Sequence, residues 1–300
     1  MAFQGKTVVV GVTSSIAAYK SVSLVSELKK MGINVIVVMT KNSAELVTPL
    51  TFETISKNKV YIDTFNREFS FDVHHISLAK KADAFIVCPA TANFIAKMAN
   101  GIADDMLSTT FLAMRCPVLV APAMNTAMYE NIATTTNLQT LKNRGIKIIE
   151  PESGMLACED VGKGRLADIS VIKEHILNAL SENKDYIGKK VLITAGATCE
   201  SIDPVRYITN HSSGKMGYAL ARACSFRGAD VTLISGKTSL PCPVGVKKID
   251  ITSAEDMFGA VEKIMGDYDI IIKAAAVADY TPSTVSHEKI KKSSDGNLTL

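Results

Sequence analysis

The sequence predicts an α/β protein with two doubly wound parallel sheets, one in each half of the chain, the second incomplete. Short runs rich in Val, Ile and Ala alternate with segments whose apolar residues recur at helical spacing, which is typical of strand–helix–strand units. The alternation starts again after a polar stretch at residues 181–190. A chain of 300 residues with 47% hydrophobic content is long enough to bury two cores of ordinary size.

The first half, residues 1–188, contains five runs with the composition of buried strands. They are Thr7–Val12, Asn34–Met39, Ala84–Cys88, Val118–Ala121 and Lys147–Ile149. Between them, Ile16–Lys30 and Phe94–Leu112 carry the apolar spacing of helices, so each is predicted to cross one face of the sheet. This order predicts a Rossmann-like domain whose ligands bind beyond the carboxyl ends of the strands.

The second half, residues 189–300, repeats the pattern over a shorter length. Its predicted strands are Val191–Ala195, Asp230–Ser235 and Ile270–Ala276, and its predicted helices are Gly217–Arg227 and Ala254–Met265. This half is short for a domain, and residues 296–300 have the apolar alternation of a strand interrupted in mid-course. We therefore expect an incomplete second domain.

Composition and charge exclude several classes of protein. The 33 basic and 30 acidic residues nearly balance, so neither nucleic acid nor an anionic membrane is expected as a partner. No signal-peptide core and no run of about 18 apolar residues is found. The six cysteines form no C-x-x-C pair, which disfavours a zinc site or a disulfide framework. We expect a cytoplasmic protein.

The turn after the first strand indicates a phosphate site. It reads Gly11-Val-Thr-Ser-Ser-Ile-Ala17, which lacks the G-x-G-x-x-G of dinucleotide binders and carries hydroxyls instead. Backbone N–H groups and the helix dipole still favour an anion there, so a mononucleotide such as FMN fits better than NAD. Taken alone, Ser14 and Ser15 are as readily explained as ordinary helix caps.

Polar residues follow the next two strands as well. Thr40 comes after the second strand, and Thr91 and Asn93 come after the third. Because the carboxyl ends of parallel strands share one edge, we expect a single crevice there. The predicted cofactor-binding residues are Gly11, Ser14, Ser15, Thr40, Thr91, Asn93 and Met124.

Four motifs in the first half resemble those of the flavin-containing cysteine decarboxylases. They are VHHISLAKKAD with His75, PATANFIAKMANGIADDML, APAMN at 121–125 and GMLACEDVGKGRL at 154–166. The resemblance implies a flavodoxin-like first domain, FMN as cofactor and 4'-phosphopantothenoylcysteine as substrate. The amine of that substrate is acylated and cannot form a Schiff base, so flavin would serve as the electron sink.

The resemblance also assigns roles to three side chains. Two electrons pass from the thiol-bearing carbon to FMN, CO2 leaves from the resulting thioaldehyde, and the electrons then return. His75 takes or positions the thiol proton, although the residue pattern alone does not choose between it and His74. Asn125 orients the carboxylate, and Cys158 protonates the enethiolate carbon.

A flap is predicted close to this cysteine. Gly162, Gly164 and Arg165 indicate a mobile segment that covers substrate, with Arg165 as an anion contact. The family motif often has Gly after the Cys, whereas this chain has Glu159.

The segment GATCESIDPVRYITNHSSGKMG at 196–217 resembles the start of phosphopantothenate-cysteine ligase domains. A P-loop is rejected, because Met216 stands where a Walker motif needs Ser or Thr and Thr209 stands where it needs Gly. The resemblance implies that CTP and Mg2+ convert 4'-phosphopantothenate to an acyl-cytidylate, which cysteine attacks. The sequence designates no metal ligands.

Backbone and side-chain donors for this second reaction are assigned on the same basis. The predicted substrate or nucleotide contacts of this half are Gly196, Ser212, Ser213, Gly214, Ala275 and Asp279. Asn210 is predicted to stabilise the acyl-cytidylate during attack, and Lys289 to neutralise phosphate charge during activation. Charge patterning alone favours a solvated basic run for KIKK, and the resemblance reverses that preference.

Two other classes of function were weighed: a flavin prenyltransferase-like FMN enzyme and a non-catalytic regulatory flavoprotein. His75, Asn125, Cys158 and the ligase-like half argue against the first, and the intact catalytic positions argue against the second. By analogy with related decarboxylases we expect a homo-oligomer, a trimer or a dodecamer. Because the ligase domains of the family continue beyond the point that matches residue 300, we expect decarboxylation with weak or absent ligation.

Overall fold

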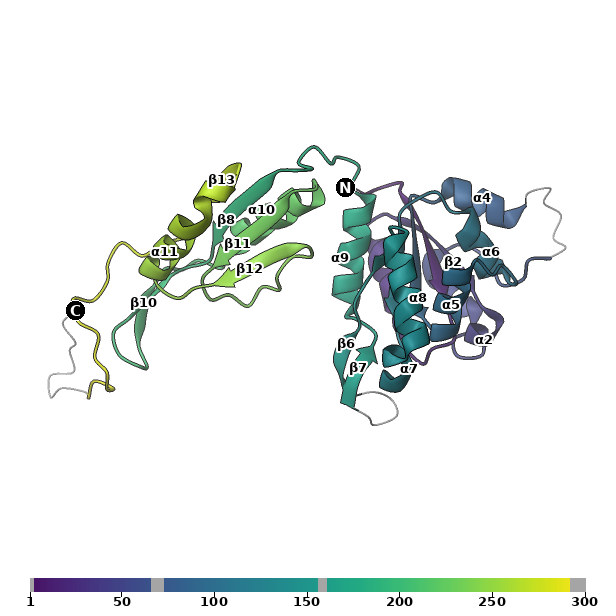
Figure 1. Ribbon diagram of the computed structural model, residues 1–300, viewed down its shortest axis with the longest axis horizontal. Helices are drawn as coiled ribbons and strands as arrows, with labels where there is room; N and C mark the ends of the chain where they lie inside the picture. Colours follow the sequence, from purple (N-terminus) through teal and green to yellow (C-terminus); the bar gives the residue numbers. More distant parts are fainter. Residues whose placement is uncertain (1–2, 66–72, 156–160, 292–300) are drawn as a thin grey trace. The chain divides into compact units, whose positions relative to one another are not determined.

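The computed structural model describes residues 3–65, 73–155 and 161–291, and it divides into two compact units, Met1–Leu180 and Ser181–Leu300 (Figure 1). Each unit has its own sheet and its own hydrophobic core. The boundary predicted between residues 188 and 189 lies just before the first strand of the second unit.

A five-stranded parallel sheet forms the centre of the first unit, with strand order β2-β1-β3-β4-β5. Its strands are β1 (Thr7–Val12), β2 (Asn34–Met39), β3 (Ala84–Ala90), β4 (Val118–Pro122) and β5 (Lys147–Ile148). The three central strands are buried almost throughout, because helices cover both faces. This is the flavodoxin-like order, whose ligands bind beyond the carboxyl ends of β1 and β3, where the strand order reverses.

Helices pack on both faces of this sheet. Those of the unit are α1 (Ala18–Lys30), α2 (Lys41–Ala44), α3 (Pro49–Ser56), α4 (His74–Lys81), α5 (Ala92–Asn100), α6 (Met106–Ala113), α7 (Thr126–Glu130), α8 (Ile132–Asn143) and α9 (Ile169–Leu180). Helices α4, α5, α6 and α8 contribute side chains to one apolar cluster, and α1 contacts both α3 and α9 apart from that cluster. The core therefore lies in two layers, one on each face.

The single helix predicted over residues 94–112 is wrong, because two helices occupy that stretch. Helix α5 ends at Gly101, whose φ of 70° is the left-handed conformation that terminates helices. Helix α6 then begins at a capping box in which the Asp105 side chain accepts from the Ser108 backbone N–H and the Ser108 hydroxyl accepts from the Asp105 backbone N–H. Apolar spacing continues across this break, so periodicity alone did not reveal it.

An antiparallel hairpin follows the sheet of the first unit. It pairs β6 (Glu152–Met155) with β7 (Val161–Arg165), where the sequence predicted a flap. Cys158 lies between the two strands in the sequence and outside the described residues.

The second unit has a four-stranded parallel sheet of order β12-β11-β8-β13 and a short antiparallel hairpin. Its strands are β8 (Lys190–Ala195), β9 (Cys199–Ser201), β10 (Tyr207–Thr209), β11 (Asp230–Ser235), β12 (Val246–Asp250) and β13 (Ile270–Lys273). Helix α10 (Lys215–Phe226) packs in one apolar cluster against the sheet, and α11 (Ala254–Ile264) packs in a second cluster.

The last strand of this sheet is shorter than predicted. The sequence predicts a strand to Ala276, but β13 ends at Lys273. Beyond it the ladder becomes irregular, since the Ala274 N–H donates to both the carbonyl and the hydroxyl of Thr194, each at 3.2 Å, and the Ala275 N–H donates to the same hydroxyl at 3.3 Å. Parallel pairing then continues as an isolated bridge between Ala276 and Ala197, just after β8. In the ranges that the structure describes, no helix is long and apolar enough to cross a membrane.

Candidate functional site

Buried hydrogen bonds tie together two strand ends of the first unit. The Thr13 side chain, 1% exposed, follows β1 and donates to the Pro89 carbonyl at 2.8 Å. The same hydroxyl oxygen accepts from the Thr91 backbone N–H at 3.0 Å. The turns after β1 and β3 are thereby fixed side by side, which creates the crevice that the sequence predicted at this edge.

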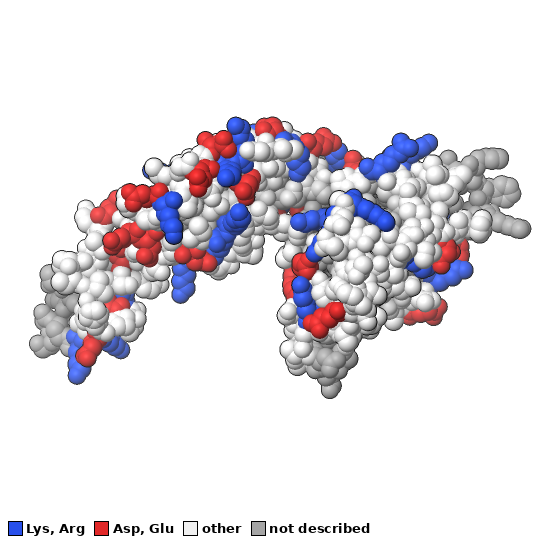
Figure 2. Space-filling view, viewed as in Figure 1, with Lys and Arg blue, Asp and Glu red and all other residues white. Residues whose placement is uncertain are grey.

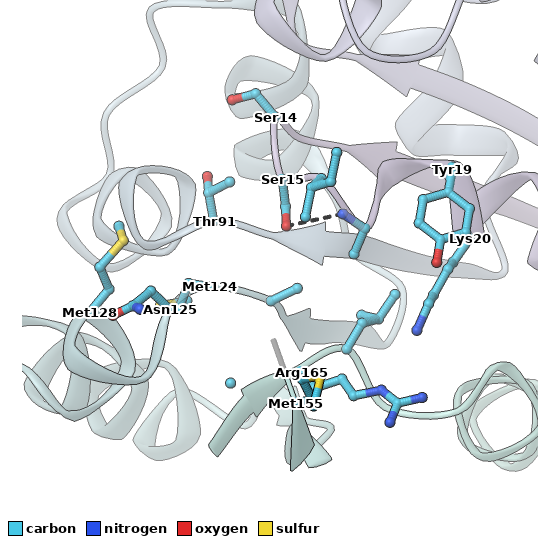
Figure 3. A pocket seen from close by; sticks show the side chains of 15 residues that line it. Ser14, Ser15, Tyr19, Lys20, Thr91, Met124, Asn125, Met128, Met155 and Arg165 are labelled. Atoms are coloured by element: carbon cyan, nitrogen blue, oxygen red, sulfur yellow. Dashed lines mark hydrogen bonds between the residues drawn. The ribbon is translucent and has the colours of Figure 1, made fainter. Parts of the chain in front are cut away.

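A cavity of about 700 Å³ opens at this edge (Figure 3). Six predicted site residues line it: Ser14, Ser15, Thr91, Met124, Asn125 and Arg165. Hydroxyl groups from the strand ends form one wall, whereas Ile16, Met128 and Met155 add apolar surface. Figure 3 also shows Lys20 and Arg165 at the end of the cavity away from Asn125.

A smaller cavity of about 210 Å³ shares Ser14 and Thr91 with the first. Thr40 and Asn93, the other two polar strand-end residues, line this one. Lys97 borders it as well, and its ammonium group bonds Asp104 at 2.6 Å and Asp105 at 2.9 Å. The hydroxyl-rich turns thus border two adjoining spaces rather than one.

Gly11 lines neither cavity. It is buried in β1, where an added Cβ would lie 2.6 Å from Leu107 Cδ1 of α6. Close packing of helix on strand accounts for glycine at this position.

Asn125 lies at the start of α7, and its position is fixed by the helix. Its side-chain Oδ1 accepts from the Ala127 N–H at 2.8 Å, an N-cap interaction. The preceding residue, Met124, donates its backbone N–H to the Gly164 carbonyl of β7 at 3.0 Å. The hairpin is therefore docked against the turn that carries Asn125.

Two glycines of β7 allow that docking. Gly164 is buried with φ 146°, and a Cβ there would overlap the Met124 carbonyl oxygen. At Gly162 a Cβ would overlap the Thr126 hydroxyl. Glycine fits both positions because the hairpin lies close to the turn, against backbone at Gly164 and against the Thr126 side chain at Gly162.

A charged network also holds the hairpin. Glu150 accepts from Tyr129, from Lys142 and from Lys163 of β7, each at 2.9 Å. Burial on its own favours the neutral carboxyl, but these donors outweigh it and lower the pKa of Glu150 to about 2. Burial raises the pKa of the Tyr129 phenol, and the neighbouring Glu150 carboxylate raises it further.

His75 is not brought to the cavity within one chain. It lies in the first turn of α4 and lines neither cavity, and α4 contacts α6. The ring of its neighbour His74 packs against Tyr61, with centroids 5.3 Å apart, and Tyr61 bridges to Val38 of the edge strand β2. Of the three predicted catalytic residues of this half, the described structure therefore places one, Asn125, at the cavity.

In the second unit, the predicted glycine positions meet at the ends of β8 and β11. Gly214 begins α10 with φ 73°, and a Cβ there would lie 3.3 Å from the Gly196 backbone. Gly196 has φ 80°, and its own Cβ would lie 3.2 Å from the Gly236 carbonyl oxygen. Ser212 stands just before α10, and its hydroxyl accepts from the Gly214 N–H at 3.4 Å. Ser213, next to it, is exposed.

The loop after β13 closes over this region. Asn210 Nδ2 donates to the Val277 carbonyl at 3.1 Å, and the Ala278 N–H donates to the Thr198 hydroxyl at 2.9 Å. Ala275 lies in the same loop and its N–H donates to the Thr194 hydroxyl, and Asp279, further along the loop, is exposed. The structure thus brings the Gly196 turn, Asn210 and the Ala275–Asp279 loop together.

Lys289 is exposed on a segment that docks elsewhere on this unit. Residues 286–291, which we call the Lys289 segment, bond through the Ser286 N–H to the Ile202 carbonyl at 3.0 Å. No group of three or more metal-ligating side chains was found among the residues that the structure describes. The predicted Mg2+ stays a prediction.

Sequence reasoning missed several residues that shape the first site. Thr13 and Lys20 were not assigned to it, because a buried threonine and a helical lysine carry no signal that separates them from ordinary core and surface residues. Glu150 was also missed, since its three partners are distant in the sequence.

Known proteins resemble this chain over both units. The family model described as Flavoprotein matches residues 2–181, and that described as DNA/pantothenate metabolism flavoprotein C-terminal domain matches residues 186–300. The coenzyme A biosynthesis bifunctional protein CoaBC of Vibrio cholerae serotype O1 is 49% identical over 297 residues, which are 99% of this chain and 74% of that protein.

Solved structures resemble the first unit. The FMN-dependent cysteine decarboxylase SpaF is 32% identical with a TM-score of 0.53, over 59% of this chain and 99% of that one. A cysteine-to-serine mutant of a PPC decarboxylase, complexed with pantothenoylaminoethenethiol, is 30% identical with a TM-score of 0.51, over 57% of this chain and 96% of its own.

Proposed function

Because the chain belongs to the family of bifunctional coenzyme A biosynthesis proteins, we propose that it joins 4'-phosphopantothenate to cysteine and decarboxylates the product to 4'-phosphopantetheine. The observation that carries this function is the 49% identity to a bifunctional relative, which extends over 297 residues and so spans both units. The chain is an enzyme with a decarboxylase unit and a ligase unit, and we assign these activities to the first and second unit respectively.

The larger cavity fits FMN. Its volume of about 700 Å³ lies within the range of small-molecule sites, roughly 300–1,000 Å³. Ser14, Ser15 and Thr91 offer hydroxyl donors suited to a phosphate or ribityl chain, and Met124 and Met128 offer apolar surface suited to a flat ring. Bound FMN would accept two electrons from the thiol-bearing carbon of the substrate and return them once CO2 has left.

Asn125 and Arg165 are proposed to hold the substrate. The cap on α7 fixes the Asn125 amide in one orientation, so that an N–H of Nδ2 can donate to the carboxylate that is lost. A neutral donor is suited to this task because it orients the carboxylate without a positive charge that would oppose CO2 loss. Arg165 lies on the docked hairpin and offers an anion contact at the other end of the cavity.

Two predicted catalytic residues complete the proposal. Cys158, outside the described residues, is proposed to donate the proton to the enethiolate carbon. His75 is proposed to act at the cavity of a second copy of the chain, because within one chain it lines neither cavity. This requires a homo-oligomer, with a trimer or dodecamer as the predicted assembly. The cytoplasmic location likewise stays a prediction.

The second unit is proposed to activate 4'-phosphopantothenate with CTP and Mg2+. Gly196, Gly214 and the start of α10 provide backbone donors for the phosphates, as glycine-rich helix starts do. Asn210 and the Ala275–Asp279 loop lie next to them, which supports their role in holding the acyl-cytidylate while the amine attacks.

A pair of asparagines provides the test. Asn125 and Asn131 both cap helices, with Oδ1 accepting at 2.8 and 2.9 Å, but only Asn125 lines the cavity. Aspartate at either position keeps the cap. We expect N125D to lower the formation of 4'-phosphopantetheine about 100-fold or more, because a carboxylate repels the substrate carboxylate where a donor held it. N131D should keep wild-type activity.

The readouts separate the possible failures. Flavin absorbance should be equal in the wild type and both variants, and 4'-phosphopantetheine is quantified by mass spectrometry. A wild-type protein that binds flavin but releases no CO2 from 4'-phosphopantothenoylcysteine contradicts the proposed decarboxylation. Equal activity of N125D and N131D contradicts the role of Asn125.

A further inference from the structure

A buried carboxylate stands at the turn between β9 and β10. The Asp203 side chain is 0% exposed, and its Oδ1 accepts from the backbone N–H groups of Val205 at 2.8 Å and Arg206 at 2.7 Å. These two bonds close the turn, as aspartate side chains commonly do. A turn of this kind needs only one carboxylate oxygen to accept its two N–H groups.

The second oxygen reaches a distant part of the chain. Asp203 Oδ2 accepts from the Ile290 N–H at 3.2 Å, across 87 residues of sequence, and lies 3.2 Å from Arg206 Nη1. The other Arg206 nitrogen, Nη2, donates to the Ile290 carbonyl at 3.2 Å. Both backbone groups of Ile290 are therefore held by the 202–206 turn.

The same turn connects the Lys289 segment to the rest of the proposed ligase site. On one side the Ser286 N–H bonds the Ile202 carbonyl. On the other side β10 leads directly to Asn210, which bonds the Val277 carbonyl of the loop after β13. A single carboxylate thus fixes the backbone next to Lys289, within a few residues of the strand that leads to Asn210.

Charge strengthens this arrangement. Burial by itself favours the neutral carboxyl, but the backbone N–H groups of Val205, Arg206 and Ile290 and the Arg206 guanidinium hold the pKa of Asp203 below its ordinary value. The carboxyl is therefore ionised near neutral pH. Hydrogen bonds to an ionised acceptor are stronger than those between neutral groups.

We propose that Asp203 is a positioning residue that holds the Lys289 segment in place for formation of the acyl nucleotide. Lys289 is exposed and has a flexible side chain, so the location of its ammonium group depends on where its backbone is held. The proposal rests on the proposed ligase function. It assigns to Asp203 the activation step and not the later attack by cysteine.

The test replaces the buried carboxylate and compares it with an exposed one. D203N puts an amide where Oδ1 and Oδ2 now accept three backbone N–H groups. D256N is the matched control, because Asp256 Oδ2 also accepts two backbone N–H groups, from Thr252 and Ser253, but touches no residue of the Lys289 segment. Both variants belong to the same unit.

Pyrophosphate release from CTP and 4'-phosphopantothenate, without cysteine, reports the activation step. We expect D203N to lower the single-turnover rate constant of pyrophosphate release about 10- to 100-fold, with little change in the CTP concentration that gives half of the maximal rate, because a displaced group loses contacts made in the transition state. D256N should match the wild type. Hydrogen exchange of the peptide that contains residues 286–291 should be faster in D203N and unchanged in D256N.

A second pair of variants removes the same bond from the other partner. I290P lacks the backbone N–H that bonds Asp203 and leaves the buried carboxylate in place, whereas I290A keeps the N–H. I290P should reproduce the slower pyrophosphate release even where D203N does not fold, and I290A should not. Wild-type exchange rates at 286–291 in D203N, or equal pyrophosphate release by D203N and D256N, overturn the proposal. No pyrophosphate release by the wild type contradicts the proposed ligase function instead, and the exchange measurement then still decides whether Asp203 holds the segment.

Discussion

Replacing Gly164 by alanine should undock the β6–β7 hairpin from the turn that carries Asn125. A residue other than glycine at φ 146° costs about 1–3 kcal/mol. The Cβ would also overlap the Met124 carbonyl oxygen, so the bond from the Met124 N–H to the Gly164 carbonyl, worth about 1 kcal/mol, is lost. The docked hairpin is therefore destabilised by about 2–4 kcal/mol. At 1.4 kcal/mol per factor of ten, the docked population relative to the undocked one falls about 30- to 700-fold.

Decarboxylation of 4'-phosphopantothenoylcysteine by purified protein measures this effect, since Arg165 is carried by the hairpin and lines the cavity. We expect G164A to reduce kcat/KM at least about ten-fold. The control is G145A, because Gly145 has φ 80° with no atom within 4 Å of an added Cβ. It bears a backbone strain of about 1–2 kcal/mol without a clash. The midpoint temperature of thermal unfolding should fall in both variants, whereas decarboxylase activity should fall only in G164A. Full activity of G164A would refute the conclusion that hairpin docking builds the site.

Two further predictions concern ionisation in the first unit. Glu150, with its pKa lowered from 4.5 to about 2, adds stability that is complete above pH 4.5 and is lost as the pH falls toward 2, so an E150Q variant should unfold with a flatter pH dependence across that window. Its side chain is 49% exposed, so each ion pair contributes less than about 1 kcal/mol, and identical acid unfolding profiles for E150Q and wild type would exclude the network. Burial raises the pKa of the Cys88 thiol to about 12, so iodoacetamide at pH 8 should modify Cys88 only at the rate of global unfolding. Rapid modification of Cys88 in the native protein, followed by peptide mass spectrometry, would show that this cysteine is accessible and can compete with Cys158 as a proton donor.

Strands buried on both faces were the elements that the sequence predicted best. The bounds of β1 and β2 match the prediction, because a strand covered on both sides must be apolar at nearly every position. β12 was missed, since it reads VKKID at the edge of its sheet and is only partly buried. The strands of the β6–β7 hairpin were missed for a similar reason, as ESGM and VGKGR contain neither alternation nor a run of branched residues.

Some residues of the candidate site could likewise be predicted from the sequence, and others could not. Ser14, Thr40 and Thr91 were predictable because the carboxyl ends of parallel strands meet at one edge whatever the rest of the fold does. His75 was selected by its motif, but no motif encodes whether a helix presents its residue to the cavity of the same chain or to that of another copy.

The contacts that hold the β6–β7 hairpin and the Lys289 segment in place were beyond any sequence pattern. Gly164 meets Met124 and Asp203 meets Ile290 through backbone N–H and carbonyl groups, which every residue except proline carries in full. In each bond the geometry restricts the residue type of one partner only. That partner is a glycine in the first case and a buried carboxylate in the second. In each unit a segment that bears a proposed functional cation, Arg165 or Lys289, is held by its backbone next to that residue. Substituting Arg165 or Lys289 therefore tests the charge of the side chain. Substituting Gly164 or Asp203 tests where that charge is placed. The two kinds of variant should differ in whether KM or kcat changes.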